Sequence, residues 1–403
     1  MSVVRGRKRH RRRTIGAVLA GAALLFVTAC GGGDEPDDGK GGGSDKADTA
    51  PSKAVVTISP EDGTGDVATN GALKVGAENG KLSEVTVQDT KGNKVDGKIA
   101  ADGASWTPAR HLAASTKYKV HAVAKDAEGR QSAKEASFTT LSPKNTFVGI
   151  FTPEDGSTVG VGMPFSLHFT RGITDPAAVE KGIEIKTVPA VPVEGHWFGN
   201  DRLDFRPEKY WKAGTKVTVK LNLDGVEGRP GVYGEQVKTV SFTIGRSQVS
   251  VVDAKSHKMK VVRDGKEIKT LPITAGAPAT TTYNGQMVIS EKHRVTRMNG
   301  DTVGFGGEYD IKDVPHAMRL STSGTFIHGN YWAPGAPGKE NVSHGCVGLR
   351  DVRGGYDKKQ PAAWFYDNSL IGDVVVVKNS KDKQIQPDNG LNGWNMSWQE
   401  WKS

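Results

Sequence analysis

An internal repeat restricts what residues 54–245 can fold into. The tetrapeptide Pro-Glu-Asp-Gly stands at 60–63 and again at 153–156. Two further pairs follow in the same order: Trp106-Thr107-Pro108 with Phe205-Arg206-Pro207, and Phe138-Thr139-Thr140 with Phe242-Thr243-Ile244. The distance between the copies grows from 93 to 99 and then to 104 residues, so insertions lengthen the second copy. A fixed order of motifs at similar spacing indicates one structural unit that occurs twice.

The first copy consists of short apolar runs separated by turns. Val55-Val56-Thr57-Ile58 is such a run, and Asn79-Gly80 and Glu128-Gly129 are such turns. Short strands at regular spacing predict β-sandwiches, so we expect immunoglobulin-like domains at 54–142 and 143–245. Neither copy gathers His, Cys or carboxylate residues in a catalytic pattern. We therefore expect them to be spacers, with ligand binding as the alternative.

From residue 246 the sequence still favours strands. Arg263-Asp264-Gly265-Lys266 is typical of a tight hairpin turn, residues 362–366 favour a helix, and residues 373–377 favour a buried strand. The predicted fold class is mostly β: two immunoglobulin-like β-sandwiches, a β-rich third domain at 246–378 and a short C-terminal extension at 379–403.

Three tryptophans mark this extension. Trp394, Trp398 and Trp401 are spaced i, i+4 and i+7, which places their indoles on one face of a predicted helix. We expect a clamp that packs on the third domain, and a sugar-binding stripe is the alternative.

Residues 1–29 are typical of an export signal. Seven basic residues between Arg5 and Arg13 precede an uncharged apolar segment at 15–27. This segment is shorter than the about 20 residues that span a bilayer, but it suits a secretory signal peptide. Val27-Thr28-Ala29-Cys30 resembles a lipobox, so we expect a lipid on Cys30 and a flexible tether over 30–53. An ordinary cleavage site or a short anchor is the alternative.

The basic charge of the chain belongs mainly to this segment. Seven of the 54 Lys and Arg residues lie in it, and the other 47 nearly balance 45 Asp and Glu. The formal net charge of +9 therefore does not indicate a nucleic-acid partner.

Cys346 is the only cysteine besides Cys30. A lone thiol on an exported protein is either reactive or buried and inert. Two histidines, His328 and His344, precede Cys346 closely, and an imidazole can take the thiol proton and hold the thiolate as an ion pair. Gly345 permits a sharp turn before Cys346, so that successive N–H groups can line an oxyanion hole.

The residues alone are also compatible with roles that involve no nucleophile. Cys346 can be a buried structural thiol. His328, His344 and Cys346 can instead bind zinc. Either histidine can also be a hydrogen-bonded strand or turn residue without a catalytic role.

The motif as a whole resembles a known family. His328-Gly329-Asn330, followed by Ser343-His344-Gly345-Cys346 and Arg350, is similar to the signature of the L,D-transpeptidase (YkuD-like) catalytic domain. Tandem immunoglobulin-like domains before it and a Trp-rich piece after it resemble the lipid-anchored enzymes of this family. The resemblance is most specific at 323–350, and it implies neither a cofactor nor a metal.

The resemblance assigns roles by position. It implies that Cys346 is the nucleophile, that His328 is the general base, and that the carbonyl of Gly329 orients the His328 ring. The N–H groups of Gly345 and Cys346 would line the oxyanion hole. The residues implied to contact substrate are Met298 and Tyr309 in a lid, Ser323 and Gly324 in a strand, Trp332, Ser343, His344 and Arg350.

One position departs from the family pattern. Many relatives have Asn two residues after the cysteine, where this chain has Gly348. The role of that Asn is therefore absent or supplied by Arg350.

The implied function is a peptidoglycan L,D-transpeptidase that forms 3→3 crosslinks between stem peptides through a Cys346 thioester. The implied place of action is the cell wall, outside the membrane that holds the lipid. Carbapenem β-lactams are implied as covalent inhibitors. Water as acceptor would give L,D-carboxypeptidase activity, and a protein amine would attach that protein to peptidoglycan.

Three rival functions differ in recognisable ways. A sortase needs Thr-Leu-x-Thr-Cys, which is absent, and an NlpC/P60 hydrolase places its Cys before its His. A non-catalytic cell-wall-binding scaffold with an inert Cys346 is the alternative of another class.

Overall fold

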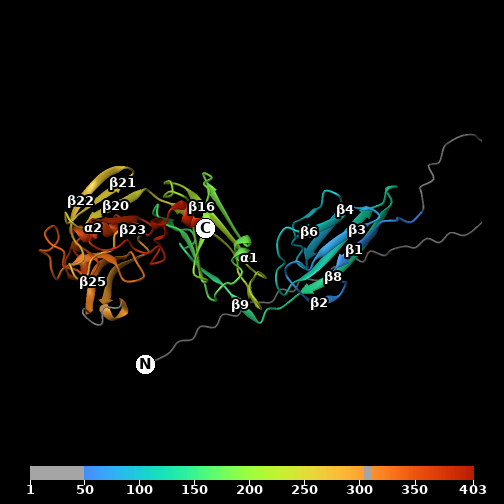
Figure 1. The fold of residues 1–403 in the computed structure, drawn as a ribbon, viewed down its shortest axis with the longest axis horizontal. Coiled ribbons are helices and arrows are strands. Elements are labelled where there is room, and N and C mark those ends of the chain that lie inside the picture. The colour runs from blue at the N-terminus through green and yellow to red at the C-terminus, as the bar shows by residue number, and fades with distance from the viewer. Residues whose placement is uncertain (1–49, 304–309) are drawn as a thin grey trace, which may run out of the picture. The chain divides into compact units, whose positions relative to one another are not determined.

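The computed structural model of the protein describes residues 50–303 and 310–403 (Figure 1). The predicted export signal, Cys30 and most of the predicted tether lie outside the described residues, as does Tyr309. Within these two ranges, no helix is long and apolar enough to cross a membrane. Strands dominate, as the sequence predicts.

The first repeat unit is a sandwich of two four-stranded sheets. Its strands are β1 (Val55–Ser59), β2 (Thr64–Val67), β3 (Lys74–Glu78), β4 (Lys81–Asp89), β5 (Gly97–Ile99), β6 (Ser105–Pro108), β7 (Lys117–Lys125) and β8 (Gln131–Thr140). The sheet orders are β1-β3-β6-β5 and β2-β8-β7-β4. Burial alternates along β7, because every second side chain of a strand faces the core between the sheets.

The second repeat unit has the same plan with additions. Its elements are β9 (Asn145–Phe147), β10 (Gly149–Thr152), β11 (Thr158–Val159), β12 (Phe165–Phe169), α1 (Pro176–Lys181), β13 (Ile183–Val188), β14 (Glu194–Phe198), β15 (Arg202–Arg206), β16 (Lys216–Asn222), β17 (Glu227–Arg229), β18 (Val232–Gly234) and β19 (Val237–Ile244). The sheets are β10-β12-β15-β14, β11-β19-β16-β13 and the smaller β17-β18-β9. Asp175 caps α1 by accepting from the Ala178 N–H (3.0 Å).

The repeated Pro-Glu-Asp-Gly motif makes the same contact in both units. Asp62 Oδ1 accepts from the Ser137 N–H (2.6 Å), and Asp155 Oδ1 accepts from the Ser241 N–H (2.8 Å). After each motif a short strand pairs in parallel with the last long strand of its unit, β2 with β8 and β11 with β19. The prediction of one structural unit that occurs twice is confirmed.

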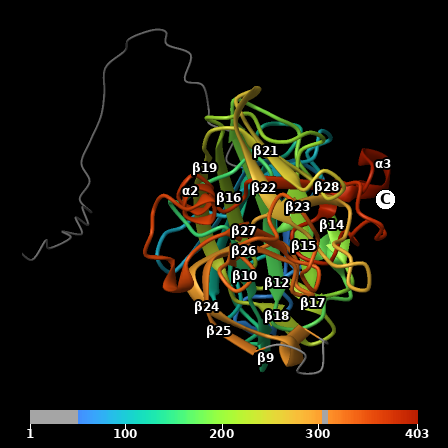
Figure 2. The same cartoon turned by 90° about the vertical axis from the view of Figure 1, so that its left-hand side faces the viewer.

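The third domain is built on one nine-stranded sheet with the order β23-β28-β20-β21-β22-β27-β26-β25-β24. These strands are β20 (Gln248–Asp253), β21 (Lys258–Arg263), β22 (Lys266–Thr274), β23 (Gly285–Val288), β24 (Glu291–Asn299), β25 (Asp310–Arg319), β26 (Phe326–Asn330), β27 (Val347–Arg350) and β28 (Val374–Lys378). The helices are η1 (Gly300–Val303), η2 (Arg353–Gly355) and α2 (Pro361–Asp367). Figure 2 shows β26 and β27 side by side, with β24 and β25 beyond them.

Local sequence signals in this domain are confirmed. Asp264 and Gly265 both have positive φ (49° and 79°) in the turn that joins β21 to β22, as a tight hairpin requires. The predicted helix at 362–366 is α2, and the apolar run at 373–377 forms the buried strand β28.

The prediction of one helix for the C-terminal extension is wrong. The extension has two short helices, η3 (Gly393–Asn395) and α3 (Trp398–Trp401), because Met396 between them is extended (φ −93°, ψ 143°). The three indoles nevertheless meet. They surround the guanidinium of Arg206 on β15, whose Cζ lies 4.7, 5.4 and 4.2 Å from the ring centroids of Trp394, Trp398 and Trp401.

The clamp formed by these tryptophans packs on the third domain, as predicted, and also on the second sandwich, which was not predicted. Trp394 Nε1 donates to Gly162 O (2.7 Å), and Trp401 Nε1 donates to Glu194 O (3.0 Å). A contact from Gln286 Nε2 on β23 to Trp394 O (2.8 Å) joins the clamp to the third domain as well. Trp394 and Trp401 are buried, so their rings are core groups and do not form a sugar-binding stripe.

Candidate active site

Two neighbouring parallel strands bring His328 and Cys346 together. In the register of β26 and β27, Ile327 pairs with Val347 and His328 with Gly348. Cys346 immediately precedes β27 and lines the same pocket as His328. Gly345 has φ +111°, a conformation that side chains disfavour, so glycine permits the turn that presents Cys346.

The imidazole of His328 is buried and held in one orientation. Its Nδ1 lies 2.9 Å from Gly329 O, and because a carbonyl only accepts, Nδ1 carries the hydrogen. Nε2 is then the basic nitrogen. Trp332 stacks on the ring with the centroids 5.4 Å apart. Burial lowers the pKa of His328, opposed by the contact with Gly329 O and by the charge of Asp351. A neutral base results at neutral pH.

The thiol of Cys346 is equally enclosed. It packs with Ala317 and Phe326, and Met298 covers this cluster. Sγ donates to Gly324 O (3.5 Å). Burial raises the pKa of Cys346 to about 11, opposed by the Phe326 N–H and the charge of Arg319. The resting thiol is therefore protonated at neutral pH.

This charge state differs from the ion pair predicted from the sequence. Both Cys346 and His328 lose water on folding, and desolvation disfavours the thiolate and the imidazolium together. Burial therefore favours a neutral thiol and a neutral imidazole in this pocket. Proton transfer must then accompany attack on the substrate.

The pocket around this pair has a volume of about 310 Å³. Six predicted residues line it: Met298, His328, Trp332, Ser343, His344 and Cys346. Five lining residues were not predicted: Thr274, Ile311, Asn330, Val342 and Gly348. Asn330 follows His328 by two residues on β26, so strand alternation puts both side chains on one face, and this signal was available in the sequence.

Some predicted substrate residues do not line the pocket. Ser323 and Gly324 lie in the turn before β26, not in a strand as predicted. Ser323 is bound to Asn389 of the C-terminal extension through its N–H (3.0 Å) and its Oγ (2.8 Å). Gly324 reaches the site only through its carbonyl. Arg350, at the end of β27, is exposed outside the pocket.

The position of Gly348 is filled by neighbouring side chains. A Cβ at Gly348 would lie 2.7 Å from Thr274 Cγ2 and 3.4 Å from Asn330 Nδ2. The amide of Asn330 therefore lies close to the position that a side chain at residue 348 would occupy. Asn330, not Arg350, brings an amide to this part of the pocket.

The loop before Cys346 is fixed by Ser343. Its Oγ donates to Cys346 O (2.5 Å) and accepts from the Gly345 N–H (3.2 Å). The Gly345 N–H was predicted to line an oxyanion hole. In the resting structure it is already bound to Ser343, so an oxyanion must compete with this hydroxyl group.

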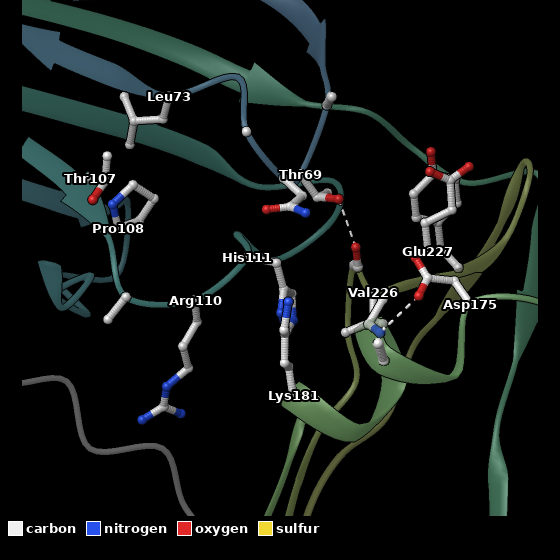
Figure 3. Close-up of a pocket in the computed structure, with 18 of the residues that line it drawn as sticks. Thr69, Leu73, Thr107, Pro108, Arg110, His111, Asp175, Lys181, Val226 and Glu227 are labelled. Carbon is white, nitrogen blue, oxygen red and sulfur yellow. Dashed lines mark hydrogen bonds between the residues drawn. The ribbon is translucent and has the colours of Figure 1, made fainter. Parts of the chain in front are cut away.

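Neither a metal site nor the larger cavity of the protein changes the assignment of the pocket around Cys346 and His328 as the candidate active site. In the two described ranges, no group of three or more His, Cys, Asp or Glu side chains is placed to hold a metal ion. A larger cavity, about 940 Å³, lies between the two sandwiches and contains neither Cys346 nor His328 (Figure 3). Thr69 Oγ1 donates to Gly225 O (2.6 Å) across it, and Arg110 and Lys181 stand at its exposed rim.

Two family descriptions match the chain. That of a bacterial Ig domain matches residues 64–227, and that of the L,D-transpeptidase catalytic domain matches residues 247–377. The chain is 32% identical to L,D-transpeptidase 2 of Mycobacterium tuberculosis, over 99% of this chain and 96% of that protein. It is 30% identical to L,D-transpeptidase 5 of the same species, over 86% of this chain and 76% of that protein.

Among solved structures, L,D-transpeptidase 3 from Mycobacterium tuberculosis, in complex with a faropenem-derived adduct, is similar with 28% identity and a TM-score of 0.46. The alignment covers 57% of this chain and 97% of that chain.

A thiol and an oriented imidazole that line one pocket are the equipment of a cysteine acyltransferase, and the fold and pocket place this protein in that class of enzymes. The similarity over nearly the whole length of a relative identifies the family within the class. The chain belongs to the L,D-transpeptidases.

Proposed function

We propose that this enzyme crosslinks peptidoglycan stem peptides in the cell wall through a thioester on Cys346. One observation carries the proposal. Gly329 O fixes Nδ1 of His328 as the protonated nitrogen, which leaves Nε2 as the base in the pocket that also holds the Cys346 thiol.

In the first half-reaction His328 Nε2 takes the proton of the thiol as Sγ attacks the carbonyl of an L,D peptide bond in a tetrapeptide stem. The C–N bond breaks, and the departing D-alanine amine takes the proton from His328. The donor is left as a thioester of Cys346. A covalent intermediate divides one difficult acyl transfer into two easier steps.

In the second half-reaction the side-chain amine of a neighbouring stem attacks the thioester. It gives a proton to His328, the C–S bond breaks, and the sulfur regains a proton from His328. The product is a 3→3 crosslink. Water as acceptor in the same site gives a tripeptide, and the half-exposed Trp332 at the pocket mouth is placed to influence which acceptor enters.

The proposal also includes a lipid anchor. The lipobox-like sequence ending in Cys30 and the polar tract that follows it support a lipid in the outer face of the cell membrane. The two sandwiches then act as spacers that set how far into the wall the pocket works. Labelling with a radioactive or clickable fatty acid tests this, and Cys30→Ala must abolish the label.

A carbapenem should acylate the same sulfur. Its strained carbonyl is an acyl donor for a thiol with an adjacent base, and the resulting thioester adds the mass of the drug. Intact-mass analysis should show one adduct on the parent chain and none on Cys346→Ala. An adduct on the Ala variant would refute the assignment of the nucleophile.

The deciding experiment uses the full chain with purified tetrapeptide stems, read by mass spectrometry. We expect crosslinked dimers from the parent chain and no product from Cys346→Ala or His328→Ala. His293→Gln is the matched control, because His293 is a partly exposed histidine of β24 paired with Glu291. Dimers from His328→Ala at the parent rate would exclude His328 as the base.

A further inference from the structure

A second buried histidine, paired with a carboxylate, lies directly behind the catalytic histidine. His316 on β25 and Asp351, just after β27, are joined by a 2.7 Å contact between Nδ1 and Oδ2. Their side chains are 1% and 0% exposed. A buried ion pair or charged hydrogen bond is costly to desolvate and often adds little to stability, so this pair calls for a role other than stability.

The carboxylate touches the backbone that orients His328. A Cβ added to Gly329 would lie 2.3 Å from Asp351 Oδ2 and 2.6 Å from Asp351 Cβ. Only a glycine therefore admits the carboxylate here. The carbonyl of this same Gly329 accepts from His328 Nδ1. Asp351 therefore lies against the peptide unit that orients the catalytic ring.

The pair is held on several sides. The second oxygen of Asp351 accepts from the Val352 N–H (2.8 Å). His316 stands at φ +50°, a left-handed conformation, and its ring lies against Tyr366 of α2 with the centroids 5.2 Å apart. Gly355 of η2 closes the other side, since a Cβ there would lie 2.8 Å from His316 Cε1.

We propose that Asp351, held by His316, is a positioning residue whose negative charge stabilises His328 when it becomes an imidazolium during acyl transfer. The inference rests on the proposed role of His328 as base. It does not make Asp351 a catalytic residue, because Asp351 does not line the pocket.

The groups that face Asp351 are few. They are His316 from β25 and His328 from β26, with Tyr366 of α2 reached through the His316 ring. Arg353 of η2 is engaged by Asp313 on the exposed side (2.7 Å). The charge of Asp351 raises the pKa of His328, against the stronger effect of burial.

The test measures kcat/KM of the full chain against pH, with tetrapeptide stems as substrate, for the parent and Asp351→Asn. A general base works when neutral, so activity rises as pH rises through the pKa of His328. Removal of the negative charge lowers this pKa. The rising, acidic part of the pH profile (the acidic limb) should therefore move to lower pH. The plateau value of kcat should fall about tenfold because a weaker base remains, and KM should change little.

Two further variants keep the test decisive. Asp351→Ser also removes the charge, is smaller and still accepts a hydrogen bond, so it serves if Asp351→Asn does not fold. Asp313→Asn is the matched control, because it removes an exposed carboxylate that is paired with Arg353 on the same domain. His316→Asn keeps a donor to Asp351 and a side chain suited to left-handed backbone, and should leave the acidic limb in place.

The outcomes are distinguishable. A shift of the limb to lower pH in a folded variant without Asp351, and not in Asp313→Asn, supports the proposal. An unmoved limb in such a variant, or an equal shift in Asp313→Asn, overturns it. If instead the proposed function is wrong, the parent chain itself shows no activity that depends on Cys346.

Discussion

Trp332 covers one face of the His328 ring, with the two ring planes 22° apart and the centroids separated by 5.4 Å. The indole therefore forms one wall of the pocket beside the base. It is itself 42% exposed, at the mouth of the pocket.

Replacement of this indole should weaken catalysis without unfolding the enzyme. An aromatic pair contributes about 0.5–1.5 kcal/mol, so Trp332→Ala should lower kcat/KM by about 2- to 12-fold. It should also raise the share of hydrolysed tripeptide over crosslinked dimer, because water reaches the thioester more easily. Product ratios by mass spectrometry measure both effects. Tyr356→Ala, which removes another exposed aromatic ring of the domain, should change neither.

Alkylation of Cys346 should depend steeply on pH. The thiolate is the reactive form, and burial raises the pKa of Cys346 to about 11. Below that pH the thiolate fraction, and with it the rate of inactivation by iodoacetamide, should rise about tenfold per pH unit between pH 7 and 9. Stopped-time activity assays give these rates. A plateau already at pH 7 would mean that the free enzyme holds a preformed ion pair with His328.

Gly348 should not tolerate a side chain unless Thr274 makes room. The Cβ of Gly348→Ala would lie 2.7 Å from Thr274 Cγ2, and overpacking of this kind costs about 1–3 kcal/mol. Urea denaturation should show this loss in the single variant. Thr274→Ser removes only the methyl group and keeps the hydroxyl bonds to Glu340 O and the Val342 N–H. The double variant should recover most of the stability, and additive losses would contradict a steric cause.

Arg206 should hold the C-terminal extension in place. Its buried guanidinium donates to Gly393 O and Met396 O (both 3.2 Å) in the centre of the three indoles. Arg206→Ala leaves these carbonyls and the aromatic faces without their cation, so the free energy of unfolding should fall by about 3–5 kcal/mol. Lys402→Ala, an exposed cation near Trp398, should cost less than about 0.5 kcal/mol. A loss as small for Arg206→Ala would refute the clamp.

The sequence determined what depends on short stretches of chain. The repeated Asp62 and Asp155 motifs predicted two equivalent units, because each motif carries its own turn chemistry. The Ser343–Cys346 motif identified the family, since those residue types at that spacing are needed for a thiol nucleophile. The turn at Asp264-Gly265 and the helix α2 were predictable for the same local reasons.

Tertiary structure decided what depends on separated strands and on the loss of water. The charge state of the Cys346 and His328 pair followed from burial, which no local pattern reports. The C-terminal tryptophans met around Arg206 although they share no helix, because the partner comes from β15, nearly two hundred positions earlier in the chain. Asp351 gained its place behind His328 only because β25, β26 and β27 are neighbours in one sheet and Gly329 leaves room for a carboxylate.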